Sequence, residues 1–167
     1  YGGAGGDFAS LCVAIEELGR VDQSLGITLS AGVGLGANPI FKFGNDDQKE
    51  AVRLFARLRE LRDRYGLAVP SWRLGLAALA RRLPSDEAYD WLERLKVRRR
   101  DAEAIAAAIT VGPRLVERLR EATDPAEVVA IADRYAPDAP LVALALGDLP
   151  QLHAYFERLR DVRLEVS

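Results

Sequence analysis

Apolar residues recur with a helical period along most of this chain. Leu11, Ala14, Ile15 and Leu18 stand at i, i+3, i+4 and i+7, a spacing that places them on one face of a helix. The same spacing recurs in two further sets: Ala88, Trp91, Leu92 and Leu95, and later Leu152, Tyr155, Phe156 and Leu159. No comparable alternating run predicts a sheet. The sequence therefore predicts an all-α fold, an array of about eight or nine helices joined by short loops.

Proline, glycine and capping residues mark the expected helix boundaries. Pro113 lacks a backbone donor, so Gly112-Pro113 is expected to end or kink the helix that begins near Ala102. The other expected boundaries are a capping-box start at Asp124-Pro125 with Glu127, a start at Pro84-Ser85, and a short break bracketed by Pro137 and Pro140.

One long helix is expected in the first half of the chain. Asn45 is a good helix cap, and Gln48 stands three residues later. From there one apolar stripe continues as far as Tyr65, through Ala51, Leu54, Phe55, Leu58 and Leu61. The pattern predicts a single continuous helix over about residues 45–64.

The composition is typical of a soluble globular protein, with 49% hydrophobic and 29% charged residues among 167. The single Cys12 excludes an internal disulfide and fits a reducing compartment. No apolar run approaches the roughly 20 residues that span a bilayer, and no signal peptide is visible. We expect a cytoplasmic protein with no membrane partner. Because the chain opens on Tyr1 and not on Met, we expect a fragment of a longer protein.

The charge divides unevenly along the chain. Residues 1–50 carry seven acids and three bases, a net charge of −4, whereas residues 51–167 carry eighteen acids and twenty bases, a net charge of +2. This difference is too small to establish a nucleic-acid partner. It does indicate that the two parts differ in composition.

Several motifs near the start of the chain occur in an order typical of one enzyme family. They are Tyr1-Gly2-Gly3-Ala4-Gly5-Gly6-Asp7, Glu16-Glu17-Leu18-Gly19-Arg20-Val21-Asp22, Leu35-Gly36-Ala37-Asn38-Pro39-Ile40, and Phe43-Gly44-Asn45 with Gln48-Lys49. On these motifs residues 1–50 resemble the N-terminal helical domain of the acyl-CoA dehydrogenases.

The resemblance implies chemistry that this stretch does not complete. Enzymes of that family oxidise acyl-CoA thioesters with FAD, and their flavin-contacting β domain and catalytic carboxylate lie well downstream. What the resemblance carries over is one wall of the acyl pocket, formed here by Thr28, Ala31, Gly32 and Leu35. The alternative is that these small residues only allow helices to pack closely.

The rest of the chain carries a second set of motifs. They are Leu54-Phe55-Ala56-Arg57-Leu58, Tyr89-Asp90-Trp91-Leu92-Glu93-Arg94-Leu95-Lys96, Arg99-Arg100-Asp101-Ala102-Glu103, and Asp161-Val162-Arg163-Leu164-Glu165-Val166-Ser167. On these motifs residues 51–167 resemble the C-terminal helical region of bacterial CCA-adding tRNA nucleotidyltransferases and their poly(A) polymerase relatives. In that family the helical region positions tRNA, and a separate N-terminal head holds the catalytic metals.

The second resemblance suggests a phosphate-binding cluster of Lys96, Arg98, Arg99 and Arg100, just before the helix expected near Ala102. Cations at a helix start oppose the helix dipole, so an anion bound there would account for them. The alternative is local neutralisation of the cluster by the acids Glu93, Asp101 and Glu103.

Other candidate chemistry is sparse. One histidine, His153, and one cysteine provide no metal cluster and no recognisable nucleophile and base pair. His153 is expected on the surface or half-buried. Trp91 lies on an apolar helical stripe and is expected in the core, while the position of Trp72 is left open. We assign no catalytic residue, no metal and no cofactor.

Taken together, the sequence predicts a fusion of two truncated enzyme fragments, residues 1–50 and residues 51–167, with no self-sufficient catalytic site. Weak binding of tRNA or other RNA by the second piece is the expected residual activity. The alternative is acyl-CoA or flavin binding by the first piece. Each piece lacks the elements that cover its apolar faces in its parent family, so we expect partial mutual covering and self-association.

Overall fold

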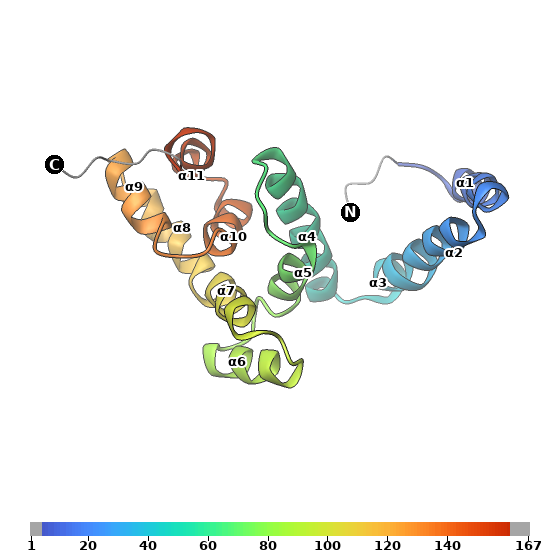
Figure 1. Ribbon diagram of the computed structural model, residues 1–167, viewed down its shortest axis with the longest axis horizontal. Coiled ribbons are helices and arrows are strands. Elements are labelled where there is room, and N and C mark those ends of the chain that lie inside the picture. The colour runs from blue at the N-terminus through green and yellow to red at the C-terminus, as the bar shows by residue number, and fades with distance from the viewer. Residues whose placement is uncertain (1–4, 161–167) are drawn as a thin grey trace. The chain divides into compact units, whose positions relative to one another are not determined.

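The computed structural model describes residues 5–160, which form helices and connecting turns with no β-strand among them (Figure 1). The all-α prediction is confirmed. Because α2, η1 and α3 follow one another without a break, as do α11 and η2, the segments make ten continuous helices, slightly more than expected. Residues 1–4 of the opening motif and the motif at residues 161–167 lie outside the described residues.

The helical segments follow one another in chain order. They are α1 (Phe8–Val21), α2 (Gln23–Ala31), the π-helix η1 (Gly32–Ala37), α3 (Asn38–Phe43), α4 (Asp46–Arg64), α5 (Ser71–Leu79), α6 (Ser85–Arg94), α7 (Arg99–Thr110), α8 (Gly112–Glu121), α9 (Pro125–Ala132), α10 (Asp138–Gly147), α11 (Pro150–Ala154) and the π-helix η2 (Tyr155–Leu159).

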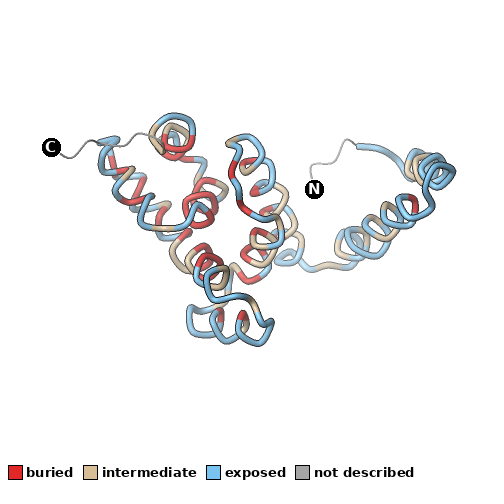
Figure 2. The backbone as a smooth tube through the Cα atoms, viewed as in Figure 1, coloured by how far each residue is buried: buried red, intermediate tan, exposed pale blue. Residues whose placement is uncertain are grey.

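The chain divides into two compact units, residues 1–53 and residues 54–167. The boundary falls inside α4, three residues after the boundary expected from the sequence. Buried residues are plentiful from α4 to η2 and scarce in α1, α2, η1 and α3 (Figure 2). Each unit therefore needs its own account of what holds it together.

The first unit is held together by a close backbone crossing. A Cβ atom added to Gly26 on α2 would lie 3.1 Å from the carbonyl oxygen of Ile15 and 3.2 Å from Cα of Gly19, so the backbones of α1 and α2 meet at this point. Gly26 is the single buried residue among residues 5–50. A larger side chain there would push the two helices apart, and no apolar core would hold them.

Residues 23–43 form one uninterrupted apolar helix in which η1 is the central part. This helix is 21 residues long and contains an 18-residue window with a mean hydropathy of 1.2, so it is long and apolar enough to cross a membrane by length and composition. The sequence reading missed this helix as a candidate span, because Asn38, Pro39 and Lys42 interrupt the apolar run but not the helix.

The start of α4 has the hydrogen bonds expected of a capping box. The backbone N–H of Gln48 donates to Oδ1 of Asn45 at 2.9 Å, and the backbone N–H of Asn45 donates to Oε1 of Gln48 at 3.0 Å. Gly44 precedes this cap, and a Cβ atom there would collide with the carbonyl oxygen of Ile40. The predicted continuous helix over residues 45–64 is confirmed.

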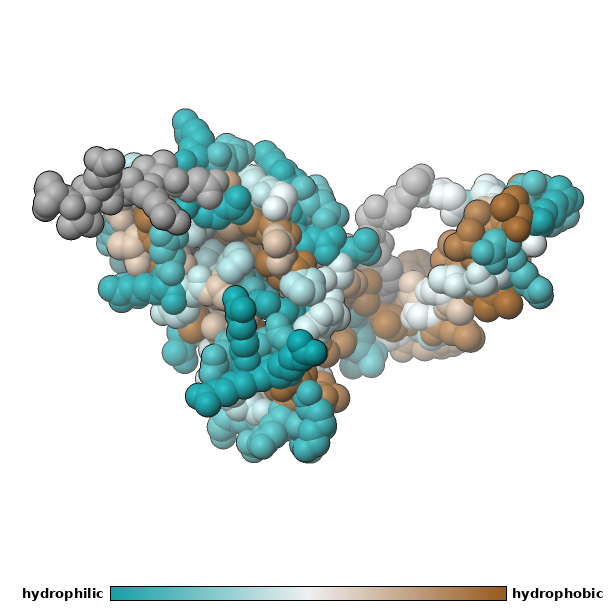
Figure 3. Space-filling view, viewed as in Figure 1, coloured by the Kyte–Doolittle hydropathy of each residue, from teal (hydrophilic) through white to brown (hydrophobic). Residues whose placement is uncertain are grey.

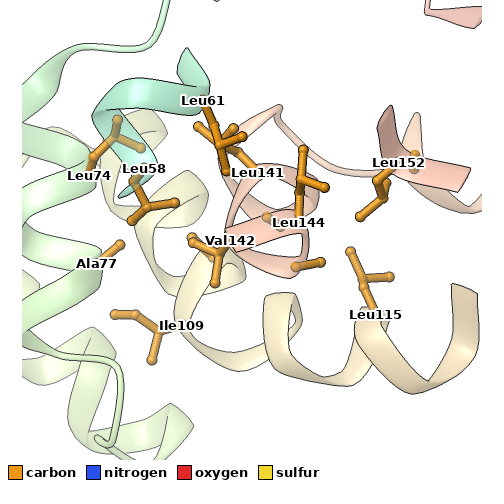
Figure 4. Packing of buried hydrophobic residues seen from close by; sticks show 14 of the residues in the cluster. Leu58, Leu61, Leu74, Ala77, Ile109, Leu115, Leu141, Val142, Leu144 and Leu152 are labelled. Carbon is orange, nitrogen blue, oxygen red and sulfur yellow. The ribbon is translucent and has the colours of Figure 1, made fainter. Parts of the chain in front are cut away.

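The second unit has a contiguous apolar core. In the close-up Leu58 of α4 lies near Leu74 of α5 and Leu61 lies near Leu141 of α10, and the side chains of α10 lie between those of α4 and those of α8 and α11 (Figure 4). The fully buried large apolar side chains are Leu58, Leu74, Leu92, Ile105, Leu115, Leu119, Leu141, Leu144 and Leu152. Burying each of them contributes about 1.5–3 kcal/mol, so this core is the main source of stability.

Most predicted boundaries agree with the structure, including the starts of α6 at Ser85, α8 at Gly112 and α9 at Pro125. The break bracketed by Pro137 and Pro140 is wrong. Pro137 is the N-cap of α10 and Pro140 lies in its first turn, where a missing backbone donor costs nothing. At Asp124 the side chain accepts from the backbone N–H of Ala126 at 2.9 Å.

Candidate functional site

The four residues assigned to an acyl-pocket wall share one face of the helix formed by α2 and η1. Thr28, Ala31, Gly32 and Leu35 follow at i, i+3, i+4 and i+7, which a helix places on one side. Leu35 is 81% exposed, and the hydroxyl of Thr28 donates to the backbone oxygen of Ser24 at 2.7 Å. The structure therefore brings these residues together on an open surface.

The glycines of η1 do not serve to pack helices within this unit. A Cβ atom added to Gly32 or Gly34 would meet no other atom within 4 Å. Close helix packing thus occurs at Gly26, which was not among the candidate residues, and not at these two positions. The π-helical turn over residues 32–37 adds a second local feature, because such turns often occur at functional sites.

The first unit also exposes large apolar side chains on α1, α2 and α3. Apolar residues form brown patches on α1, α2 and α3 in the space-filling view (Figure 3). The exposed fractions are 77% for Phe8, 86% for Val21, 61% for Ile27, 63% for Phe41 and 85% for Phe43. Exposed large apolar side chains in this number favour a binding surface on the first unit.

The cationic cluster occupies a different position from the one expected. Helix α7 begins at Arg99 and not near Ala102, so Arg99 and Arg100 lie in its first turn and Arg98 is its N-cap. Lys96 lies in the loop before it, with φ at 55°. The sequence offered no side-chain cap to mark this start, which explains the misplaced boundary.

Local acids neutralise only part of this cluster. Nε of Arg99 donates to Oε1 of Glu103 at 3.0 Å, as the neutralisation alternative expected. Asp101 instead faces Arg73, whose Nη1 lies 3.3 Å from its Oδ1. Lys96 and Arg98 make no ion pair with another residue in the range 5–160.

A buried ion pair that the sequence did not reveal connects α5 with α10. Nε of Arg73 donates to Oδ1 of Asp138 at 3.0 Å, and Nη2 donates to Oδ2 of the same carboxylate. Asp138 is 1% exposed. Burial raises the pKa of Asp138, an effect that the neighbouring guanidinium of Arg73 opposes.

A polar network at the C-terminal end of α4 was also missed. The hydroxyl of Tyr65 bonds to Nδ1 of His153, whose Nε2 lies 3.2 Å from Oδ1 of Asp148. Nη2 of Arg57 donates to the same oxygen at 2.8 Å. The hydrogen bond from His153, together with the charge of Arg57, lowers the pKa of Asp148, while burial raises the pKa of Tyr65.

The remaining aromatic and titratable candidates have structural positions. His153 is half-buried, as predicted, and Trp91 packs partly buried against the core cluster. Trp72 is 48% exposed on α5. No group of three metal-ligating side chains comes together anywhere in residues 5–160.

Comparison with known proteins identifies the first unit. Residues 1–53 match the family model of the acyl-CoA dehydrogenase N-terminal domain. A probable acyl-CoA dehydrogenase of Bacillus subtilis is 46% identical over 50 residues, which is 30% of this chain and 13% of that protein. The resemblance seen in the sequence of the first unit is thus confirmed.

Two further relatives are named as short-chain specific acyl-CoA dehydrogenases. The protein from Megasphaera elsdenii is 53% identical over 53 residues, or 30% of this chain and 14% of the relative. The protein from Clostridium acetobutylicum is 39% identical over 71 residues, or 42% of this chain and 19% of the relative. This chain therefore spans less than a fifth of the length of these relatives. No solved structure matches it significantly.

The similarity to the Clostridium acetobutylicum protein extends further along the chain than the family match. Because 42% of 167 residues is about 70 residues, that alignment ends at residue 70 or later wherever it begins. The similarity to this relative thus reaches past the 53 residues of the family match and through α4.

The main functional prediction is contradicted by these comparisons. The sequence predicted a fusion whose second piece binds tRNA or other RNA weakly, and no comparison supports it. The matching family model and the relatives above are all described as acyl-CoA dehydrogenases. The assignment relied on diffuse helical motifs and on arginines that the structure places in the first turn of α7 or in a pair with Glu103. The alternative, acyl-CoA or flavin binding by the first piece, fits better.

Proposed function

We propose that the first unit contacts the acyl part of an acyl-CoA thioester, and that Thr28, Ala31, Gly32 and Leu35 form the contacting wall. The observation that carries this proposal is the match of residues 1–53 to the acyl-CoA dehydrogenase N-terminal domain, in a unit whose corresponding face is open. Two relatives are named as short-chain specific, so we propose a short acyl chain as the ligand.

The chemistry of the wall suits an apolar chain. Leu35 offers a large exposed apolar side chain, and Gly32 leaves the helix backbone accessible beside it. Burying one methylene contributes about 0.8 kcal/mol. A short acyl chain that contacts one wall therefore gains only a few kcal/mol at most, and tight binding requires an opposing surface from elsewhere.

The flavin alternative fits the first unit poorly. FAD carries two phosphates, which bind to cations or to free helix N-termini. Residues 1–50 have a net charge of −4, and the guanidinium of Arg20 is held by Glu16 at 2.8 Å and by Glu17. The first-turn amides of α1, α2 and α4 already receive the side chains of Asp7, Asp22 and Asn45. We therefore assign no flavin contact to these residues.

We further propose that the chain does not catalyse acyl-CoA oxidation by itself. The resemblance places the catalytic carboxylate and the flavin-contacting β domain of the family downstream of the matched stretch. In this chain residues 54–160 are helices and turns. Turnover of an acyl-CoA with an artificial electron acceptor, by the purified chain supplied with FAD, would contradict this part of the proposal.

We propose a cytoplasmic location. It assumes that the apolar helix over residues 23–43 packs within a protein, as the family match of its sequence favours.

The acyl-binding proposal is tested by titrating the isotope-labelled chain with butyryl-CoA and following its amide NMR signals. We expect saturable shifts at residues 28–35, and smaller ones with CoA alone because CoA lacks the acyl chain. Equal shifts with both ligands, or shifts confined to residues 54–160, would contradict the proposal.

A matched pair of variants separates ligand contact from folding. Gly32 and Gly34 both face open space on the same helix, so Gly32→Leu and Gly34→Leu gain similar helix propensity. Gly32 lies on the face with Thr28 and Leu35, whereas Gly34, two residues further along the same helix, lies on roughly the opposite side. We expect Gly32→Leu to change the butyryl-CoA shifts and Gly34→Leu to leave them as in the parent chain.

A further inference from the structure

A groove in the second unit lies between α5 and the loop that joins α6 to α7. It has a volume of about 510 Å³ and opens to solvent. Its apolar lining consists of Trp72, Leu76, Leu95 and Val97. A volume of this size falls in the range of small-molecule sites, and the apolar lining is typical of them.

The apolar lining is incompletely covered by the protein. Trp72 is 48% exposed and Leu95 is 49% exposed, whereas Leu76 and Val97 pack against the core of this unit. A ligand with an apolar body would remove this surface from water, which is favourable in proportion to the area buried. The groove thus offers a hydrophobic driving force for binding.

Two cations at the edge of the groove give it a charge preference. Lys96 and Arg98 line the groove, and neither forms an ion pair within the described part of the chain. Asp101 lines it as well, but Arg73 engages this carboxylate at 3.3 Å. The three lining charges sum to +1, which matches a single negative charge on a ligand.

The backbone at Lys96 is unusual for a lysine. The N–H of Lys96 donates to the carbonyl of Glu93 at 2.9 Å and the N–H of Val97 donates to that of Leu92 at 3.1 Å, the two bonds of a Schellman motif. Lys96 has φ at 55°, in the left-handed region where such motifs usually have glycine. A strained residue at the edge of a groove is a reason to look for a role of its side chain.

We propose that this groove binds an apolar monocarboxylate, with the carboxylate beside Lys96 and Arg98 and the apolar body against Trp72 and Leu95. The proposal goes beyond the acyl-thioester wall, because the groove lies in the other unit and uses different residues. A polyanion is a poor match, since each phosphate that binds requires its own cation and the groove has a net surplus of one. The shared chemistry covers aliphatic and aromatic acids.

Trp72 fluorescence reports binding directly. The chain has two tryptophans, so Trp91→Phe leaves Trp72 as the single indole while keeping an aromatic ring in the core. In this background the full chain is titrated with an aliphatic acid (octanoate), an aromatic acid without an indole ring (phenylbutyrate) and an amine of similar length (octylamine). All three are kept below micelle-forming concentrations. We expect a saturable change in Trp72 emission with one or both acids, and no saturation with octylamine. The stronger of the two acids identifies the aliphatic or the aromatic class.

Charge variants test the carboxylate contact. The double variant Lys96→Asn with Arg98→Gln removes both cations, and asparagine tolerates the left-handed backbone of Lys96. We expect the Kd of the acid to rise by about tenfold or more, because the carboxylate loses both of its cationic partners. Arg99→Gln is the matched control, since the guanidinium of Arg99 is paired with Glu103, and its Kd should equal that of the parent.

Three results would overturn the proposal. One is the absence of a saturable response to both acids, and another is octylamine binding as tightly as octanoate. The third is a double variant that binds the acid as tightly as the parent while its circular dichroism spectrum shows that it is folded. A double variant that fails to fold is replaced by Lys96→Asn alone, for which about half of the loss in binding free energy is expected.

Discussion

Arg73 of α5 holds Asp138 at the first turn of α10 through two hydrogen bonds to one carboxylate. Asp138 is 1% exposed, and the side chain of Arg73 is 13% exposed. The pair is 65 residues apart in sequence and joins two helices that both contribute to the core of the second unit. Removing Arg73 leaves the carboxylate of Asp138 as a buried charge without its counter-ion, whereas Arg73 also faces Asp101.

We predict that Arg73→Leu lowers the free energy of unfolding by about 3–5 kcal/mol, because the buried carboxylate of Asp138 then loses its partner. Urea unfolding followed by circular dichroism measures the change. The control is Arg57→Leu, which removes the exposed pair with Asp148 and should cost far less. The double variant Arg73→Met with Asp138→Leu should recover most of the loss, since neither charge remains. A double variant as unstable as Arg73→Leu would show that packing and not charge is responsible.

The left-handed backbone of Lys96 predicts that a substitution at this position increases stability, unlike the substitution of Arg73. We expect Lys96→Gly to raise the free energy of unfolding by about 0.5–1 kcal/mol, because glycine adopts positive φ without the steric cost that a Cβ atom imposes. Lys96→Ala removes the same amine but keeps the Cβ atom, so it should bring no such gain. Equal midpoints of thermal unfolding for the two variants would show that the backbone at this position is not strained.

The helices of the first unit should respond to acid through their caps. Hydrogen bonds from the backbone and side chain of Ser10 lower the pKa of Asp7, and those of Ser24 lower the pKa of Asp22. A carboxylate whose folded pKa lies below its unfolded value stabilises the fold above the unfolded pKa and ceases to do so as the pH falls through the folded one. We therefore expect α1 and α2 to lose helicity as the pH falls below about 4.

The measurement is the pH dependence of backbone carbon chemical shifts in residues 8–31. Asparagine caps helices as well as aspartate and does not titrate. The double variant Asp7→Asn with Asp22→Asn should retain its helices at neutral pH and lose the acid-dependent change in this region. An unchanged acid transition in this variant would assign the effect to other carboxylates.

The exposed apolar surface of the first unit predicts self-association. Val21 and Phe43 are 86% and 85% exposed, and burying such side chains gains about 1.5–3 kcal/mol each. We expect the sedimentation coefficient to rise with protein concentration, and the rise to weaken in Val21→Ser with Phe43→Ser. Leu146→Ser changes an exposed leucine of the second unit and serves as the control. A monomer at every concentration would contradict this prediction.

Helix boundaries set by local interactions were predictable from the sequence. The cap of Asn45 with Gln48 involves residues three apart, and the proline at the start of α9 fixes its own φ angle. The start of α7 at Arg99 was missed because Arg98 makes no capping hydrogen bond from its side chain. A break was wrongly predicted at Pro140, because from sequence alone a proline in the first turn of a helix resembles a proline that ends one.

The polar networks of the second unit could not be predicted in this way. Tyr65 and His153 are 88 residues apart, and no local pattern indicates that they meet. The groove beside Trp72 likewise depends on how the loop before α7 returns to α5. The four residues of the proposed acyl-pocket wall were chosen from the family resemblance, and their shared helix face follows from their spacing within two turns.

The reciprocal cap between Asn45 and Gln48 has a consequence for how this chain tolerates change. It lets α4 begin from its own hydrogen bonds, so the rotation that points Leu54, Leu58 and Leu61 inward is set downstream of Gly44. Whatever replaces, lengthens or shortens the preceding helices does not need to be in phase with that stripe. The position just before Asn45 is thus a natural place for evolution or protein engineering to exchange the upstream segment without disturbing the core that follows.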